Sequence, residues 1–228
     1  MKKKQKQNKA ILFTRVPKPG QCKTRLMPQL SADECCKLNR SFIIDELEVL
    51  NRVCDEVIVF YDGELDDLLK RDRPLLKPQV GSDIFERMDN AFRESFEADG
   101  HANYILFGSD IPMLDELTIL EAFKDLQSSD VTICKSDDGG YFLIGLSKYT
   151  NVPFSIELAD GGRDVSQKTI EACLKSGLRV SSVSRENLFD IDVIDDLKRL
   201  ADNKDMLLSN KSQTYKFLES WESKESWV

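Results

Sequence analysis

The chain has 228 residues, of which 41% are hydrophobic and 32% are charged, and its formal net charge at pH 7 is −8. These values are typical of an ordinary globular protein and exclude a disordered or fibrous one. The negative charge argues against nucleic acid as a partner, because binding nucleic acid requires a basic surface.

The sequence also bears on the location of the protein, on the state of its cysteines and on the kind of catalysis it can perform. No apolar run approaches the roughly 20 residues that cross a bilayer, and no signal-peptide pattern follows the charged N-terminus. We therefore expect a cytoplasmic protein with no membrane partner. The six cysteines form no C-x-x-C pair and suit free thiols, and His101 is the single histidine, which argues against His-dependent catalysis.

The chain divides into three parts in this interpretation. We expect residues 1–9 to form a disordered basic tail and residues 10–203 to form one α/β domain. Residues 204–228 are expected to add a polar, partly helical extension.

Strand and helix alternate along the N-terminal half. A continuous apolar run at residues 10–14 predicts a buried strand. Ser31 and Glu34 form a capping box, which opens a helix that runs to about residue 53. We predict a strand at 56–61, a short helix at 65–69, a weaker strand at 75–80 and an amphipathic helix at 83–98.

The alternation continues through the C-terminal half. A strand at 104–108 precedes a helix at 116–126 that Asp115 caps, and two strands follow at 131–134 and 141–146. We then expect a helix at 164–176, a strand at 179–183, a helix at 193–201 and another around 215–221. This pattern predicts a mostly parallel sheet with helices on both faces, whose ligands bind beyond the carboxyl ends of the strands.

A basic loop follows the first strand directly, at residues 14–26. Its cations are Arg15, Lys18, Lys23 and Arg25, and Gly20 permits a tight turn or a close approach of the backbone to a ligand. Cations and free backbone N–H groups bind phosphate oxygens, so we expect this loop to hold a di- or triphosphate. The alternative is a solvated basic loop, and the Walker A pattern is absent.

Acidic residues stand at three other loops of the ligand edge. Asp110 follows the strand at 104–108 and is either a ligand for Mg²⁺ or Mn²⁺ or a helix N-cap or turn residue. Asp137 and Asp138, before two glycines, suit either a ligand site or a hairpin turn. Of the aspartates at 190 and 192, we expect one to cap the helix at 193–201 and the other to complete a metal site.

Taken in order, these segments resemble the DUF2064 family, which is described as glycosyltransferase A-like or selenodomain-associated and is related to the 2-phospholactate guanylyltransferases. The resemblance covers about residues 10–200, and the ordered set carries it rather than any single motif. The matching motifs are Pro17-x-Pro19-Gly20-x-x-Lys23-Thr24-Arg25-Leu26, Gly81-x-x-x-x-x-Arg87-Met88, Gly108-Ser109-Asp110-x-Pro112, Asp138-Gly139-Gly140-Tyr141 and Asp190-Ile191-Asp192.

The resemblance implies the nucleotide-diphospho-sugar transferase (GT-A) fold. This is a three-layer α/β/α arrangement on a mostly parallel mixed sheet with one antiparallel strand, which we place at 141–146. It implies a metal on Asp110 with Asp192, or with Asp190 or Asp138 instead. It also implies a nucleotide site formed by Arg15, Lys18, Gly20, Lys23, Thr24, Arg25 and Arg87, and an acceptor pocket at Asp138, Gly139, Gly140 and Tyr141. Whether Arg87 faces the nucleotide or only packs stays open.

The chain departs from the family pattern at several positions. Arg15 and Ile111 stand where the family often has Lys and Cys. Lys135 and Ser136 replace a common Pro, and a Trp expected near residues 153–165 is missing. The last two changes fall at the expected acceptor pocket, so the identity of the acceptor is the property least transferable from the family.

Three functions are compatible with this pattern. The first hypothesis is nucleotidyl transfer from a nucleoside triphosphate to a small phosphorylated or hydroxyl acceptor, with Lys23, Arg25 and Asp110 as catalytic residues and Mg²⁺ or Mn²⁺ as cofactor. The second is glycosyl transfer from a nucleotide sugar, which the single aspartate at 109–112, in place of Asp-x-Asp, makes less favoured. The third is nucleotide binding without catalysis. The base, the acceptor and the oligomeric state stay open, and a homodimer is one candidate assembly.

Overall fold

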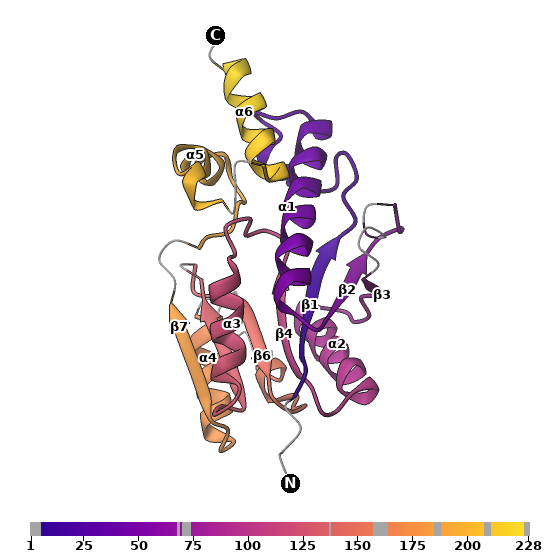
Figure 1. Ribbon diagram of the computed structural model, residues 1–228, viewed down its shortest axis with the longest axis vertical. Coiled ribbons are helices and arrows are strands. Elements are labelled where there is room, and N and C mark those ends of the chain that lie inside the picture. The colour runs from indigo at the N-terminus through magenta and orange to yellow at the C-terminus, as the bar shows by residue number, and fades with distance from the viewer. Residues whose placement is uncertain are drawn as a thin grey trace.

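A single sheet organises the molecule. The computed structural model describes residues 6–67, 69, 74–136, 138–156, 164–184, 188–207 and 211–225, and within them seven strands form one sheet in the order β3-β2-β1-β4-β6-β5-β7. Figure 1 shows β3 and β7 at opposite edges of this sheet. The strands are β1 (Asn8–Arg15), β2 (Glu56–Asp62), β3 (Leu75–Pro78), β4 (Asn103–Gly108), β5 (Val131–Lys135), β6 (Tyr141–Leu146) and β7 (Val180–Ser184).

Helices cover both faces of the sheet. They are α1 (Ala32–Val53), α2 (Ile84–Ala98), α3 (Glu116–Asp125), α4 (Val165–Lys175), α5 (Ile194–Asp202) and α6 (Gln213–Glu225), with 3₁₀ turns η1 (Thr24–Leu26), η2 (Val152–Phe154) and η3 (Lys204–Met206). Alternate residues of β1 point to two separate cores. Ala10 and Leu12 pack with residues of α1, α3, α5 and α6, whereas Ile11 and Phe13 pack with residues of α2 and α4. The expected α/β class with three layers is confirmed.

The strand directions agree with the expected mixed sheet. β1 pairs in parallel with β2 and β4, and β6 is antiparallel to both of its neighbours, β4 and β5. The carboxyl ends of β1, β2 and β4 therefore meet at one edge of the sheet. This is the edge at which ligands bind in open α/β sheets.

Local sequence signals set several helix starts. Ser31 and Glu34 make the reciprocal capping box at the start of α1. Asp83 caps α2 and Asp115 caps α3, each by accepting a hydrogen bond from the backbone N–H three residues on, at 2.9 and 2.8 Å. These caps satisfy N–H groups that have no partner inside the helix.

The start of β1 and the stretch at 65–69 differ from the expectation. β1 begins at Asn8, so Asn8 and Lys9 belong to the sheet rather than to a disordered tail; residues 1–5 lie outside the described residues. Lys9 can be buried there because its ammonium pairs with Glu56 and Asp99 at 3.4 and 3.1 Å. The helix expected at 65–69 does not form in the described residues of that stretch, 65–67 and 69.

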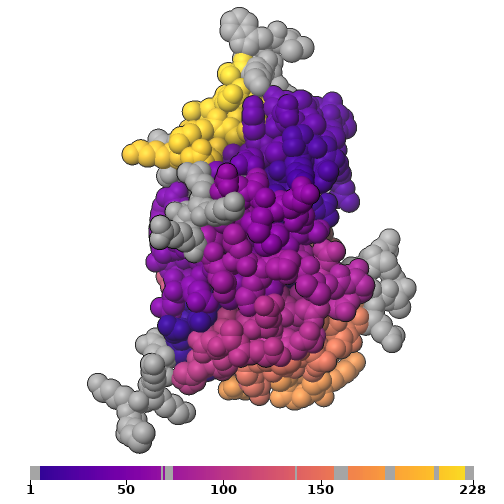
Figure 2. All heavy atoms as spheres, turned by 90° about the vertical axis from the view of Figure 1, so that its right-hand side faces the viewer, coloured from indigo at the N-terminus to yellow at the C-terminus, as the bar shows by residue number. Residues whose placement is uncertain are grey.

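The C-terminal extension packs against the N-terminal half of the chain. Asp45 of α1 accepts hydrogen bonds from the backbone N–H groups of Gln213 and Thr214, at 2.7 and 2.8 Å, and so caps α6 from another helix. In Figure 2, α6 (yellow) lies against indigo and purple residues of that half. Over the described residues, none of the helices combines the length and the apolar character that spanning a membrane demands.

Candidate functional site

A cavity of about 460 Å³ opens at the carboxyl ends of β1, β2 and β4. Its volume is within the range of small-molecule sites. Its lining includes residues from the basic loop, from the ends of these strands and from the first turns of α2. Of the expected nucleotide residues, Arg15, Lys23, Thr24, Arg25 and Arg87 line it, but Lys18 and Gly20 do not.

Two residues of the basic loop shape it from outside the cavity. Gly20 has φ +80°, a left-handed conformation that favours glycine, and open space surrounds the position where a Cβ would stand. Lys18 turns away from the cavity to pair with Glu64 at 2.6 Å. In this conformation, therefore, Lys18 does not contribute its charge to the cavity.

Lys23 is the most constrained cation of the loop. Its side chain is only 6% exposed, and its Nζ atom lies 2.7 Å from Oδ1 of Asp110 and 3.6 Å from Oδ1 of Asp192. The ammonium also donates a hydrogen bond of 2.6 Å to the carbonyl oxygen of Ile191. The chain thus brings Lys23, Asp110 and Asp192 together, although the sequence predicted phosphate contact for the first and metal for the other two.

Arg25 is an exposed cation beside one of the same carboxylates. Its guanidinium is 72% exposed and lies 3.4 Å from Oδ2 of Asp192. The backbone N–H of Ile191 donates to the carbonyl oxygen of Asp110 at 3.0 Å, which fixes the 190–192 segment against the end of β4. This backbone bond explains how two aspartates 82 positions apart share one site (192 − 110).

Neither Asp190 nor Asp192 caps α5 with its side chain. The N-cap of α5 is Val193, and Asp196 accepts from the backbone N–H groups of Asp192 and Val193, at 2.9 and 2.8 Å. The expectation that one of the two would be the cap was therefore wrong, and neither carboxylate is taken up by the start of the helix. Burial, followed by the negative charges of Asp110, Asp138 and Asp192, raises the pKa of Asp190 to about 7.

Glu46 is a site neighbour that the sequence analysis missed. It lies on α1, is 2% exposed, and neither carboxylate oxygen has a hydrogen-bond partner of normal geometry in the described structure. Burial, and secondarily the charge of Asp110, raises the pKa of the Glu46 carboxyl well above its usual range. The sequence signal was available, because Glu46 lies between Phe42 and Leu50 on the apolar face of the helix.

Asp110 and Asp192 provide only some of the ligands that a divalent ion requires. Among the described residues, no group of three or more His, Cys, Asp or Glu side chains is arranged to hold a metal. Asp110 and Asp192 do share a cation, since both approach the Lys23 ammonium. Mg²⁺ is usually held by one or two carboxylates together with substrate phosphates, so this donor set fits an ion that arrives with a nucleotide.

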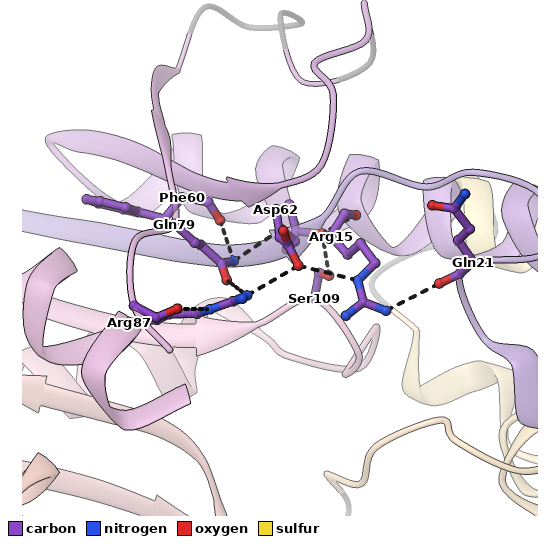
Figure 3. Close-up of polar contacts among 9 residues, drawn as sticks. Arg15, Gln21, Phe60, Asp62, Gln79, Arg87 and Ser109 are labelled. Carbon is purple, nitrogen blue, oxygen red and sulfur yellow. Dashed lines mark hydrogen bonds and ion pairs between the residues drawn. The ribbon is translucent and has the colours of Figure 1, made fainter. Parts of the chain in front are cut away.

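A second polar network lies at the other end of the cavity. Figure 3 shows Arg87 and Arg15 approaching Asp62 from opposite sides, at 3.2 and 3.7 Å. Gln79 donates to the carbonyl oxygens of Thr14 and Phe60, at 3.2 and 3.0 Å, and its side-chain oxygen accepts from Arg87 at 3.3 Å. Arg87 therefore both packs within the network and lines the cavity, which the sequence left as alternatives.

The Gly81–Arg87 spacing has a steric cause. Gly81 has φ +146°, and a Cβ at this position would lie 2.7 Å from the backbone nitrogen of Arg87. The Arg87 Nε–H donates to the carbonyl oxygen of Gly81 at 3.1 Å. Glycine is thus required for the turn that delivers Arg87 to the cavity.

The acidic turn before β6 is a hairpin. Oδ1 of Asp138 accepts from the backbone N–H of Gly140 at 2.9 Å, and Gly139 has φ +89°; Asp137 lies outside the described residues. Tyr141 lies 3.8 Å, hydroxyl to sulfur, from Met88, which lines the cavity. The turn residues Asp138, Gly139, Gly140 and Tyr141 border the site without lining the cavity, so their acceptor role stays a prediction.

Comparison with known proteins supports the resemblance. Residues 45–156 match the family model described as "Uncharacterized protein conserved in bacteria (DUF2064)". The 2-phospho-L-lactate guanylyltransferase of Methanocaldococcus jannaschii is 30% identical over 124 residues, which is 54% of each chain. The chain thus spans about half the length of the curated relatives it matches.

Solved structures extend the similarity to the whole fold. A Desulfovibrio desulfuricans G20 protein, provisionally described as a nucleotide-diphospho-sugar transferase, is 29% identical and covers 96% of both chains with a TM-score of 0.84. Rv0371c of Mycobacterium tuberculosis, solved in complex with manganese, is 16% identical, covers 86% of this chain and 99% of its own, and has a TM-score of 0.54. That second likeness shows the fold alone. Residues 45–156 of this chain therefore match the DUF2064 family, and nearly the whole chain is similar in structure to a protein described as a nucleotide-diphospho-sugar transferase.

Proposed function

We propose that this protein is a metal-dependent nucleotidyltransferase, which transfers a nucleotide from a nucleoside triphosphate to a small phosphorylated or hydroxyl acceptor. The observation that carries the proposal is the convergence of Lys23, Arg25, Asp110 and Asp192 beside the cavity at the carboxyl ends of the strands. The guanylyltransferase relatives support this reaction class.

The reaction is an in-line displacement at the α-phosphorus. An acceptor oxygen forms a bond to this phosphorus while the bond to the bridging oxygen breaks, and pyrophosphate leaves with the electron pair. Lys23 and Arg25 would neutralise charge on the leaving phosphates, and Asp110 with Asp192 would hold Mg²⁺ or Mn²⁺. A bound divalent ion supplies charge neutralisation and orientation of phosphate oxygens, so that catalysis is mostly electrostatic and positional.

Guanine is the base that we propose first. The curated relatives are guanylyltransferases, and guanine carries both hydrogen-bond donors and acceptors. The carboxylate of Asp62 and the guanidiniums of Arg15 and Arg87 line the cavity as one acceptor and two donors, although in this conformation they pair with one another. Asp138 and Tyr141, at the hairpin beside the site, are proposed to border the acceptor.

Glycosyl transfer is the second candidate. It is favoured by the likeness to the Desulfovibrio protein, which extends over 96% of the chain. The single Asp110 on the strand end, followed by Ile111, and the basic-loop cations that line the cavity, Arg15, Lys23 and Arg25, favour a triphosphate instead. Nucleotide binding without catalysis is the remaining alternative.

A thermal-shift comparison tests the proposal without knowledge of the acceptor. The panel contains the four nucleoside triphosphates and the nucleoside-diphosphate sugars, each with and without Mg²⁺ or Mn²⁺. A ligand at about 100 times its Kd stabilises the folded state by roughly 2.7 kcal/mol, or about 5–10 °C in Tm for a chain of this size. We expect the largest metal-dependent shift with GTP.

The Asp110→Asn variant assigns this shift to the site. It should lose the metal-dependent shift, because an amide keeps the shape of the carboxylate but not its charge. Glu97→Gln, at the exposed far end of α2, is the matched control and should keep the shift. A full metal-dependent shift in Asp110→Asn would reject the metal assignment, and a shift with nucleotide sugars alone would favour glycosyl transfer.

A further inference from the structure

The cations of the site already have carboxylate partners. Lys23 contacts Asp110 and Asp192, and Arg25 contacts Asp192 as well. A phosphate group that approaches these cations must compete with the carboxylates. A divalent cation that approaches the carboxylates must likewise compete with the ammonium.

Contacts other than the ion pairs with Asp110 and Asp192 also fix the position of Lys23. Its backbone is in the left-handed region, with φ 47° and ψ 41°, which is uncommon for a residue other than glycine. The carbonyl oxygen of Ile191 accepts from the ammonium at 2.6 Å, and the ring of Phe42 lies 5.7 Å from it, centroid to Nζ. Loop, helix α1 and the 190–192 segment thus all hold the ammonium between the carboxylates.

We propose that Lys23 is an exchangeable internal counter-ion, which occupies the cation position between Asp110 and Asp192 and moves to the nucleotide phosphates when a divalent cation binds these carboxylates. The proposal rests on the proposed function and deepens it. It follows that metal and nucleotide bind as a coupled pair. Metal alone must displace the ammonium and therefore binds weakly, and nucleotide alone must withdraw the ammonium from two carboxylates.

The side chain is suited to this exchange. The ammonium is a compact point charge on a flexible four-carbon stem, so it can change partners without movement of the backbone. Lys23 lines the cavity in which we propose that the nucleotide phosphates bind, so its ammonium is already next to that place.

Binding of Mn²⁺, followed by its electron paramagnetic resonance signal, measures the exchange without turnover. In the wild-type protein we expect weak binding of Mn²⁺ alone. Once the Mn²⁺ that free GTP chelates is subtracted in a protein-free titration, we expect at least about tenfold tighter binding in the presence of GTP, a coupling within the usual range. Equal Mn²⁺ affinity with and without a nucleotide that itself binds would overturn the proposal, and this comparison requires no variant.

The Lys23→Met variant, in which an apolar chain of similar length replaces the lysine, tests the cause. It should bind Mn²⁺ alone at least about tenfold more tightly than the wild type, because a positive charge has left a poorly solvated position beside two carboxylates. Arg25→Met is the matched control: it removes an exposed cation from the same Asp192, so its effect should be much smaller. Unchanged or weaker binding of Mn²⁺ by folded Lys23→Met contradicts the exchange.

These results separate the exchange from the proposed function. If no nucleotide binds with any metal, the nucleotidyltransferase proposal fails, yet Lys23→Met still reports whether the ammonium competes with the metal. If nucleotide and Mn²⁺ bind the wild type independently of each other, the exchange fails and the proposed function stands.

Discussion

Single charged residues of this chain find partners that are distant in the sequence. Asp130, at the start of β5, is the clearest case away from the cavity. Its carboxylate accepts from the backbone N–H, Nε and Nη2 of Arg179, at 3.0, 3.2 and 3.3 Å, and so ties the start of β5 to that of β7. These bonds to Arg179 lower the pKa of Asp130 to about 2.

This pKa predicts a stability difference that depends on pH. The folded-state pKa lies below the unfolded value of about 3.9, so the stabilisation is complete above about pH 4 and is lost as the pH falls toward 2. We expect Asp130→Asn to lower the free energy of unfolding by about 1–2 kcal/mol at pH 7, discounted because Arg179 is mostly exposed. Urea unfolding of both proteins between pH 7 and pH 3 checks this, and a difference that does not shrink below pH 4 would contradict it.

Individual helices and strands were predictable where their signals are local. The caps at Ser31 and Asp115 lie within three residues of the N–H groups they satisfy, and the sequence alone predicted both. The cap at Asp83 is equally local, although it was not among the predictions. Ser212 caps α6 locally, because its Oγ accepts from the backbone N–H of Tyr215 at 3.1 Å. The further cap by Asp45 could not be predicted in this way, because Asp45 lies on another helix. The helix expected at 65–69 rested on a short apolar pattern, and helices of this length are marginal on their own.

The remote cap predicts how strongly the C-terminal helix is held. Asp45→Ala should lower the free energy of unfolding by about 1–2 kcal/mol, because two backbone N–H groups at the start of α6, one buried and one partly buried, lose their acceptor. Lys37→Ala, exposed on the same helix, is the control and should change it by less than about 0.5 kcal/mol. Chemical denaturation measures both, and an equal effect of the two variants would show that the cap contributes nothing.

The arrangement of the whole molecule was only partly available from the sequence. Alternation of strands and helices predicts the parallel sheet and the edge where the ligand loops gather, and the structure agrees. The antiparallel β6 came from the family resemblance, because its apolar pattern carries no direction. The sequence placed Lys23, Asp110 and Asp192 at one edge, but their mutual pairing depends on how three separate loops meet.

A crystal structure of the protein with Mn²⁺ and a non-hydrolysable analogue of GTP would test the nucleotidyl-transfer site at the level of atoms. We expect an anomalous manganese peak at the Asp110 and Asp192 carboxylates, with the triphosphate in contact with Lys23 and Arg25. We also expect the Lys23 ammonium to have left Asp110. Manganese away from Asp110, or phosphates away from the basic loop, would contradict the assignment of this cavity as a nucleotidyl-transfer site.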